Sequence, residues 1–185
     1  PEVDPDWAEP GLTPTERVFA WNTFETLAFK TGNPDAPVNA IPGYAVAFCQ
    51  LRYVVGSDNE NFLKHIREHL DAHGFTDVEA KPSRGEAAEA TRLDPDNAWV
   101  KMAAASITQT TGKEVDVLPN LGGTLPNDAF SKILALPTVW VPHSYAACSQ
   151  HAPNEHMLGS VARESLQLMA GLFWDLGDKG AKIAA

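Results

Sequence analysis

The sequence predicts a protein of the α/β class, in which a small α+β unit with an antiparallel sheet is followed by an α/β layer. Three observations predict this class. Two runs rich in aromatic and β-branched residues are joined by a Gly- and Pro-rich link, a helix with one apolar side follows them, and helices alternate with short strand-like runs in the second half. The 185 residues are enough for one ordinary domain or two small ones.

In the first half, a leading segment over residues 1–20 is rich in Pro, Asp and Glu and is expected to be loosely ordered. Residues 21–29 and 44–55 then predict two strands, and the link between them predicts a loop. Residues 57–74 predict a helix, because apolar side chains recur on one side and a glycine ends the pattern. Residues 75–82 predict a third strand, which completes an antiparallel sheet beside one helix.

The second half begins after a polar stretch, residues 83–97, which we expect to separate two domains. Beyond it, the alternation of helices and strands predicts an α/β layer with a parallel sheet. The expected elements are a helix over 96–111, a strand over 115–119, a short helix over 127–135, a strand over 138–142 and a final helix over 159–176.

The composition argues against several kinds of partner. The net charge of −10 and the scattered positions of the 14 Lys and Arg residues argue against nucleic acid. No apolar run approaches the roughly 20 residues that span a bilayer, so no membrane is expected. Cys49 and Cys148 lie far apart and make no disulfide framework, which indicates reduced thiols and a cytoplasmic location. Because Pro1 is not a methionine, we expect translation to start upstream of it.

A histidine cluster lies in the helix predicted over 57–74. His65, His69 and His73 recur every four residues and therefore lie along one stripe of that helix. His65, Glu68 and His69 also match the inverted zincin pattern, in which two histidines bind zinc and the glutamate acts as the base. That motif needs a further ligand and a cleft, so we favour a solvated stripe on a helix that packs against a sheet.

Three further features are ambiguous when each is taken alone. Cys148 with His151 or His143 has the residue types of a nucleophilic pair, but a buried, inert cysteine is the more common arrangement. The stretch NLGGTLPND, residues 120–128, either binds an oxyanion or a carboxylate at a helix start or forms an ordinary tight turn. Arg52 lies within a predicted strand and either faces solvent or binds an anionic ligand.

Three motifs, taken in order, resemble the dinuclear-zinc aminoacylase and carboxypeptidase family (peptidase family M twenty), which includes succinyl-diaminopimelate desuccinylase, acetylornithine deacetylase and the carnosine dipeptidases. NAIPGYAVAFCQLR (39–52) is similar to the family's Asn/Thr-x-Ile-Pro followed by a strand that ends in Arg. GGTLPND (122–128) is similar to its Gly-Gly-Ser/Thr-Ile-Pro turn, and HAPNE (151–155) to its His-Ser/Ala-x-Asn-Glu segment. The similarity runs through nearly the whole chain.

The resemblance implies a zinc-dependent metallopeptidase or amidohydrolase that cleaves a peptide or N-acyl amide bond next to a carboxylate. Two zinc ions would share a bridging water, from which a glutamate removes a proton. His151 would be a zinc ligand, presented by the turn that follows it. Gly123 and Thr124 would contact the substrate at the start of a helix. Arg52 with Asn39 would hold the substrate carboxylate or polarise the scissile carbonyl.

Within the third motif, Pro153 and Asn154 are expected to shape the turn, and Glu155 is expected to orient the histidine from a second shell. The resemblance also implies two domains and a homodimer. Residues 1–81 would be part of the family's lid domain, through which the family commonly dimerises, and residues 82–185 would be the C-terminal half of an α/β metallohydrolase domain. The expected substrate is a small amide or dipeptide that carries a carboxylate.

The chain departs from the family in its metal ligands. The family takes most of them from an upstream His-x-Asp, a bridging Asp, a Glu-Glu pair and another acidic residue. This sequence has no Glu-Glu, and its one His-x-Asp, residues 69–71, falls in a predicted helix. We therefore expect the chain to correspond to the last two-fifths of such an enzyme and to be inactive by itself. Two alternatives stay open: a non-catalytic dimerisation module, and a cysteine hydrolase that uses Cys148.

Overall fold

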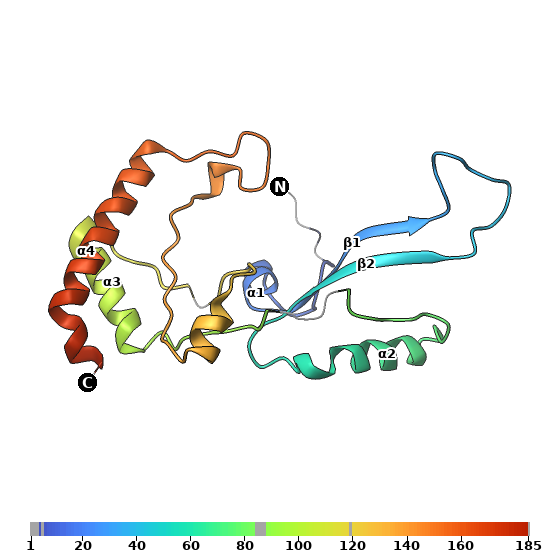
Figure 1. Ribbon diagram of the computed structural model, residues 1–185, viewed down its shortest axis with the longest axis horizontal. Coiled ribbons are helices and arrows are strands. Elements are labelled where there is room, and N and C mark those ends of the chain that lie inside the picture. Colours follow the sequence, from blue (N-terminus) through green and yellow to red (C-terminus); the bar gives the residue numbers. More distant parts are fainter. Residues whose placement is uncertain (1–3, 5, 84–87, 119, 185) are drawn as a thin grey trace. The chain divides into compact units, whose positions relative to one another are not determined.

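The computed structural model describes residue 4 and residues 6–83, 88–118 and 120–184. The chain divides into two compact units (Figure 1). Unit 1 comprises Pro1–Thr91 and Asn120–Leu125, and unit 2 comprises Arg92–Pro119 and Pro126–Ala185. No helix in the described part of the chain is both long enough and apolar enough to cross a membrane.

Unit 1 begins with a short helix, α1 (Pro14–Phe19), where the sequence predicted a loosely ordered segment. Thr13 and Glu16 form a capping box: the Thr13 hydroxyl accepts the Glu16 N–H at 3.3 Å, and the Glu16 carboxylate accepts the Thr13 N–H at 2.8 Å. The backbone hydrogen bond from Thr13 lowers the pKa of Glu16. The expectation was therefore wrong here, although the Thr-Pro-x-Glu spacing with proline in the first turn is a helix-start signal.

The two predicted strands are confirmed as an antiparallel hairpin. β1 (Thr23–Thr31) pairs with β2 (Ala45–Arg52), with Thr23 opposite Arg52 at one end and Thr31 opposite Ala45 at the other. The ladder has an irregularity between Thr26 and Ala28. These two strands form a two-stranded sheet.

The predicted helix that follows is also confirmed, as a 3₁₀ turn η1 (Asn59–Asn61) and the helix α2 (Phe62–Ala72). Gly74, with φ of 81°, follows its end in the left-handed conformation that glycine adopts without steric cost.

The third strand expected over 75–82 is not formed. The Arg67 guanidinium instead binds the backbone carbonyls of Phe75, at 2.7 Å, and Val78. A strand needs a ladder partner, and here two of the carbonyls that would bond to a neighbouring strand are bonded to α2. The side-chain pattern is that of a strand, but the pairing is absent.

Unit 2 is built on two helices that pack side by side, α3 (Ala98–Thr111) and α4 (Gly159–Ala184) (Figure 1). Both were predicted, but α4 continues past the expected end at residue 176. Asn97 caps α3 by accepting the Trp99 N–H at 2.9 Å, and Gly112 ends it with φ of 68°. Between the helices lie two short turns of helix, η2 (Ala129–Ile133) and η3 (Ala146–Cys148).

Small and polar side chains line the contact between α3 and α4. Ser106 of α3 is 2% exposed and Asp175 of α4 is 8% exposed. Lys179 donates to the Asp175 carboxylate at 2.9 Å, and this bond is the largest cause of the lowered pKa of Asp175. A Cβ added to Gly171 would lie 3.3 Å from Cβ of Thr110 and would overlap its hydroxyl oxygen. The two helices are therefore in close contact at Gly171, where α4 has no side chain.

The strands expected over 115–119 and 138–142 are not formed in the described residues, and neither is the parallel sheet; residue 119 lies outside them. Neither segment is assigned to a helix or a strand, and neither has a ladder partner among the described residues. The Trp140 indole nitrogen donates to the Asn127 side-chain oxygen at 2.9 Å, which ties one segment to the helical residues just before η2 rather than to a strand. The alternation of helix-like and strand-like segments along the sequence predicted strands. A parallel sheet also requires that two such segments lie side by side in space, so that their backbones can form hydrogen bonds.

Candidate functional site

The histidine singled out by the sequence, His151, lies on a compact loop between η3 and α4. Three residues of this loop have a left-handed backbone: Ser149 at φ 58°, His151 at φ 61° and Asn154 at φ 64°. Such values are uncommon for residues other than glycine and occur where turns are tight. Backbone hydrogen bonds close the loop, from His156 N to Cys148 O at 3.0 Å and from Ala152 N to Ser149 O at 2.9 Å.

Glu155 supports His151 through the backbone. Its carboxylate accepts the His151 backbone N–H at 3.2 Å. The side chain of His151 is exposed, and within the described part of the chain no group is hydrogen-bonded to its imidazole. The arrangement therefore fixes the position of the residue and leaves both ring nitrogens available. A metal-bound histidine usually donates its second ring N–H to a carboxylate or a carbonyl, whereas the Glu155 carboxylate bonds here to the backbone N–H and not to the ring.

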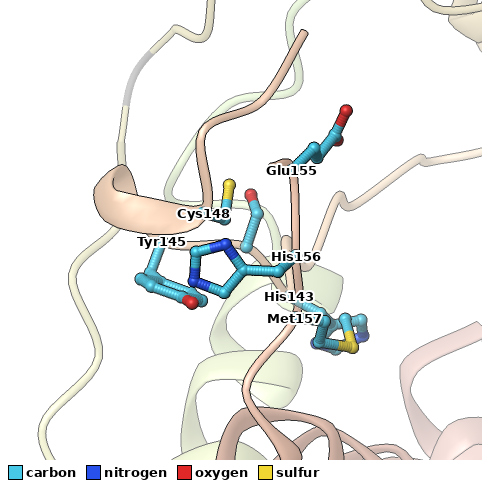
Figure 2. Close-up of a pocket in the computed structure, with 7 residues that line it drawn as sticks. His143, Tyr145, Cys148, Glu155, His156 and Met157 are labelled. Atoms are coloured by element: carbon cyan, nitrogen blue, oxygen red, sulfur yellow. The ribbon is translucent and has the colours of Figure 1, made fainter. Parts of the chain in front are cut away.

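The same segment lines an open hollow of about 310 Å³ (Figure 2). Its lining comes from one stretch of chain: His143, Ser144, Tyr145, Cys148, Glu155, His156 and Met157. The Tyr145 and His156 rings meet edge to face with centroids 6.1 Å apart, and the Tyr145 hydroxyl is buried without a partner among the described residues. Sequence reasoning did not single out Tyr145 or Met157, because neither belongs to a motif.

Cys148, the nucleophile of the cysteine-hydrolase alternative, is 7% exposed. A catalytic cysteine needs a partly exposed thiol beside a base that a third group orients. The nearby His156 instead donates from Nδ1 to the backbone carbonyl of Asn154 at 2.8 Å. The burial of the thiol favours a packing role for Cys148.

The predicted substrate ligands Asn39 and Arg52 lie at opposite ends of the β1–β2 hairpin. Arg52 is the last residue of β2, whereas Asn39 lies in the loop beyond its first residue, Ala45 (Figure 1). Seven strand steps separate Ala45 from Arg52, which corresponds to about 23 Å at 3.3 Å per residue. The Arg52 side chain is exposed and contacts Gln50 through Nε at 3.4 Å. Within one chain, Asn39 and Arg52 are therefore too far apart to bind the same small anion.

Gly123 and Thr124 lie in the short segment Asn120–Leu125, which is part of unit 1. Both residues are exposed. The Asn120 side chain donates to the Phe19 carbonyl, so this segment is anchored at the end of α1. The sequence placed the Gly-Gly-Thr turn at a helix start, and the helical stretch that includes η2 begins at Asn127, three residues after Thr124. The Asp128 side chain accepts the Ala129 N–H at 3.0 Å near that start.

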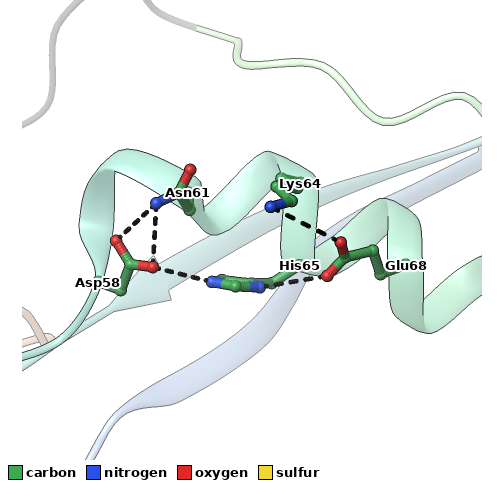
Figure 3. A network of polar contacts seen from close by, with 5 residues as sticks. All are labelled: Asp58, Asn61, Lys64, His65 and Glu68. Carbon is green, nitrogen blue, oxygen red and sulfur yellow. Dashed lines mark hydrogen bonds and ion pairs between the residues drawn. The ribbon is translucent and has the colours of Figure 1, made fainter.

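His65, the first histidine of the stripe on α2, is occupied by local polar contacts (Figure 3). His65 donates from Nε2 to Asp58 at 3.0 Å, and its Nδ1 lies 3.5 Å from the Glu68 carboxylate. The hydrogen bond with Asp58, followed by that with Glu68, raises the pKa of His65. An imidazole that carries protons on both nitrogens has no lone pair for a metal. The contacts of His65 thus argue against the inverted zincin interpretation.

We expect the pKa of His65 to exceed its ordinary value of 6.5, and the Asp58→Asn variant to lower it again, because Asp58 makes the largest contribution to the shift. The stabilisation from the charged imidazolium is complete below pH 6.5 and is lost as the pH rises through the raised pKa of His65. The pKa of Asp58 is lowered from 3.8, so its contribution is lost only as the pH falls through that lower value. An NMR titration of the His65 ring protons measures the shift, and a Lys64→Gln control is expected to leave it nearly unchanged.

The described residues do not by themselves fit a complete zinc site. No group of three or more His, Cys, Asp and Glu side chains among them is placed to hold a metal ion. A catalytic zinc takes about three protein ligands. Of the residues predicted from the sequence, the loop at His151 offers one free imidazole.

Comparisons with known proteins bear on the fold. No protein-family model and no curated protein matches the sequence. A solved structure does match: an M20 family metallo-carboxypeptidase, Sso-CP2 from Sulfolobus solfataricus, is 20% identical with a TM-score of 0.69. The match covers 92% of this chain and 42% of that one. The chain therefore has a fold similar to part of a metallo-carboxypeptidase, which confirms the predicted fold class, and it spans about two-fifths of that structure's length.

Proposed function

We propose that this chain is the C-terminal part of a zinc-dependent metallohydrolase that cleaves an amide bond next to a carboxylate. The observation that carries the proposal is the likeness of fold to a metallo-carboxypeptidase along 92% of the chain, at a TM-score of 0.69. Fold alone does not specify chemistry. The three ordered motifs add the chemistry, because they include a free imidazole, an exposed guanidinium and a Gly-Gly-Thr turn.

In this proposal His151 is a metal ligand, and the bond from its backbone N–H to Glu155 holds it in place. Since the described residues do not complete the site, the remaining ligands come from outside the present sequence. The 185-residue chain is therefore inactive by itself. We place the enzyme in the cytoplasm on the basis of its two separate cysteines.

Arg52 is the proposed carboxylate ligand, because its planar guanidinium matches a carboxylate with two parallel hydrogen bonds. Gly123 and Thr124 are proposed to contact the substrate backbone. Asn39 lies at the far end of the hairpin from Arg52, so it contacts a different group or acts in another copy of the chain. A homodimer formed through unit 1 is the proposed assembly, with residues 1–81 as its lid portion and residues 82–185 as its catalytic portion.

The sequence encoded immediately upstream of Pro1 tests this function most directly. The proposal requires a His-x-Asp and a Glu-Glu pair there, because a zinc-dependent hydrolase needs further ligands and a base. Their absence from the upstream sequence would leave the non-catalytic dimerisation module as the better interpretation.

For the 185-residue chain alone, we expect calorimetric titration to detect no submicromolar zinc binding, because a single histidine makes a weak site. The His151→Ala variant is expected to give the same isotherm as the parent chain. Tight binding that disappears on His65→Ala and His69→Ala would contradict this expectation and revive the inverted zincin interpretation of α2.

A further inference from the structure

Two exposed histidines lie close together at the C-terminal end of α2. The ring centroids of His69 and His73 are 4.2 Å apart, and the ring planes are tilted by 35°. A spacing of four residues places the two side chains one turn apart on the same face of the helix. Both residues are exposed to solvent. The pair belongs to unit 1, whereas His151 belongs to unit 2.

The backbone decides which ring nitrogen of His73 can bind a metal ion. Nδ1 of His73 lies 2.9 Å from the carbonyl oxygen of His69, and because a carbonyl oxygen only accepts, Nδ1 carries the proton. The lone pair of the neutral ring is therefore on Nε2. Metal-bound histidines usually have this arrangement, in which the second ring nitrogen donates to a carboxylate or a backbone carbonyl. Within the described part of the chain, no hydrogen bond occupies the ring of His69.

The separation of the two rings matches that of a metal chelate. A metal ion about 2.0–2.1 Å from a histidine nitrogen lies about 3.2 Å from the centre of the ring. Two imidazoles that bind one ion at a right angle therefore have ring centres about 4.5 Å apart. The observed separation of 4.2 Å is close to this value. Rotation of the exposed side chains, without movement of the helix backbone, would direct both Nε2 atoms to one ion.

The neighbouring side chains limit the site to these two ligands. His65, one turn earlier, is bonded through Nε2 to Asp58. The Asp71 carboxylate is bonded to the Arg67 guanidinium at 2.7 and 3.1 Å. Among the described residues, no group of three or more His, Cys, Asp and Glu side chains could hold a metal ion, so water completes the coordination. Tetragonal sites with nitrogen and oxygen ligands suit Cu²⁺ and Ni²⁺, whereas Zn²⁺ takes about three protein ligands.

We propose that His69 and His73 form a two-histidine site for a divalent late transition-metal ion, which binds Cu²⁺ more tightly than Ni²⁺. The partial negative charge at the C-terminal end of a helix favours a cation there, and so does the net charge of −10. The bound ion stabilises the last turn of α2, because it bridges two residues of the folded helix. The site does not rest on the proposed function, since it uses none of the residues of the proposed zinc site.

NMR of the 185-residue chain with substoichiometric Cu²⁺ locates the ion without any substitution. The paramagnetic ion is expected to broaden the ring resonances of His69 and His73 before those of His151 and His156. Earlier broadening of His151 or His156 would overturn the proposal. Equal broadening of all exposed imidazoles would also overturn it, because that result indicates an adventitious ion only.

Calorimetric titration with Ni²⁺, which the exposed thiol of Cys49 does not reduce, tests the spacing of the two histidines. His69→Ala is expected to weaken Ni²⁺ binding at least about tenfold, because even the loss of an outer-shell partner of a ligand costs about 10- to 100-fold. The matched control combines His69→Ala with Ala72→His. It restores the number of histidines but places them on adjacent residues, which do not face each other, so it is expected to bind as weakly as His69→Ala.

Three calorimetric results would overturn the proposal. They are a parent chain that binds no Ni²⁺, a His69→Ala variant that binds as the parent does, and full binding by the control with adjacent histidines. His151→Ala separates this site from the proposed zinc site. It is expected to leave Ni²⁺ binding unchanged, and a tenfold loss in this variant would assign the ion to His151 instead.

Discussion

If the proposed function holds, replacing His151 with alanine is expected to lower amide hydrolysis by the full-length protein by more than about 100-fold, because loss of an outer-shell partner of a metal ligand alone costs about 10- to 100-fold. The structure gives the physical basis. The imidazole is exposed and without a hydrogen bond in the described part of the chain, and the Glu155 carboxylate and three left-handed residues hold its backbone. The measurements are hydrolysis of an N-acyl amino acid and zinc content per chain.

His156→Ala is the matched control for this prediction. It removes an imidazole from the same loop, five residues away, whose Nδ1 is already bonded to the Asn154 carbonyl. The control is expected to retain its zinc and most of its activity. Equal losses of activity and zinc in the His151 and His156 variants would show that both act through the conformation of the loop. That result would contradict the proposed role of His151 as a metal ligand.

Adding a single methyl group at Gly171 is expected to destabilise the α3–α4 pair by about 1–3 kcal/mol, the usual cost of overpacking a tight contact. The new Cβ would lie 3.3 Å from Cβ of Thr110 and would overlap the Thr110 hydroxyl oxygen. Either the threonine side chain or one of the helices has to move. Thermal unfolding followed by the helical circular dichroism signal measures the change. The midpoint temperature of Gly171→Ala is expected to be lower than that of the parent chain.

Gly177→Ala is the control on the same helix. A Cβ at Gly177 would meet nothing within 4 Å. Alanine is the better helix former, so this variant is expected to stabilise α4 by about 0.5–1 kcal/mol. Destabilisation by Gly171→Ala together with stabilisation by Gly177→Ala would establish the close approach at Thr110. A stabilising Gly171→Ala would show that the helices are not in tight contact there.

The elements that the sequence predicted correctly are those whose signals are local. The helices α2, α3 and α4 each have an apolar periodicity within their own residues, and Gly74 and Gly112 end two of them in left-handed conformations. The hairpin was equally predictable, because one Gly- and Pro-rich loop joins two adjacent strand-like runs. The missed helix α1 carried a capping box, a local signal that the acidic and proline-rich composition obscured.

The site was predictable only as separate residues. The sequence singled out His151, Arg52, Asn39 and the Gly-Gly-Thr turn, but no motif states how far apart two of them lie. The length of β2 sets Asn39 and Arg52 at opposite ends of a hairpin. The contacts of His65 with Asp58 and Glu68 likewise became evident only with the geometry of the helix start.

By itself, the sequence determined that α2, α3 and α4 are helical and that two neighbouring strands pair, and it supplied the residues of the proposed site. The tertiary structure decided that residues 75–82, 115–118 and 138–142 do not form strands in the described chain, that Gly171 lies against Thr110, and that Phe173 and Trp174 of α4 are exposed. The physical reason is one of range. Helices and tight turns are stabilised by hydrogen bonds a few residues apart, whereas strand pairing, burial and metal coordination depend on groups that are distant in the sequence.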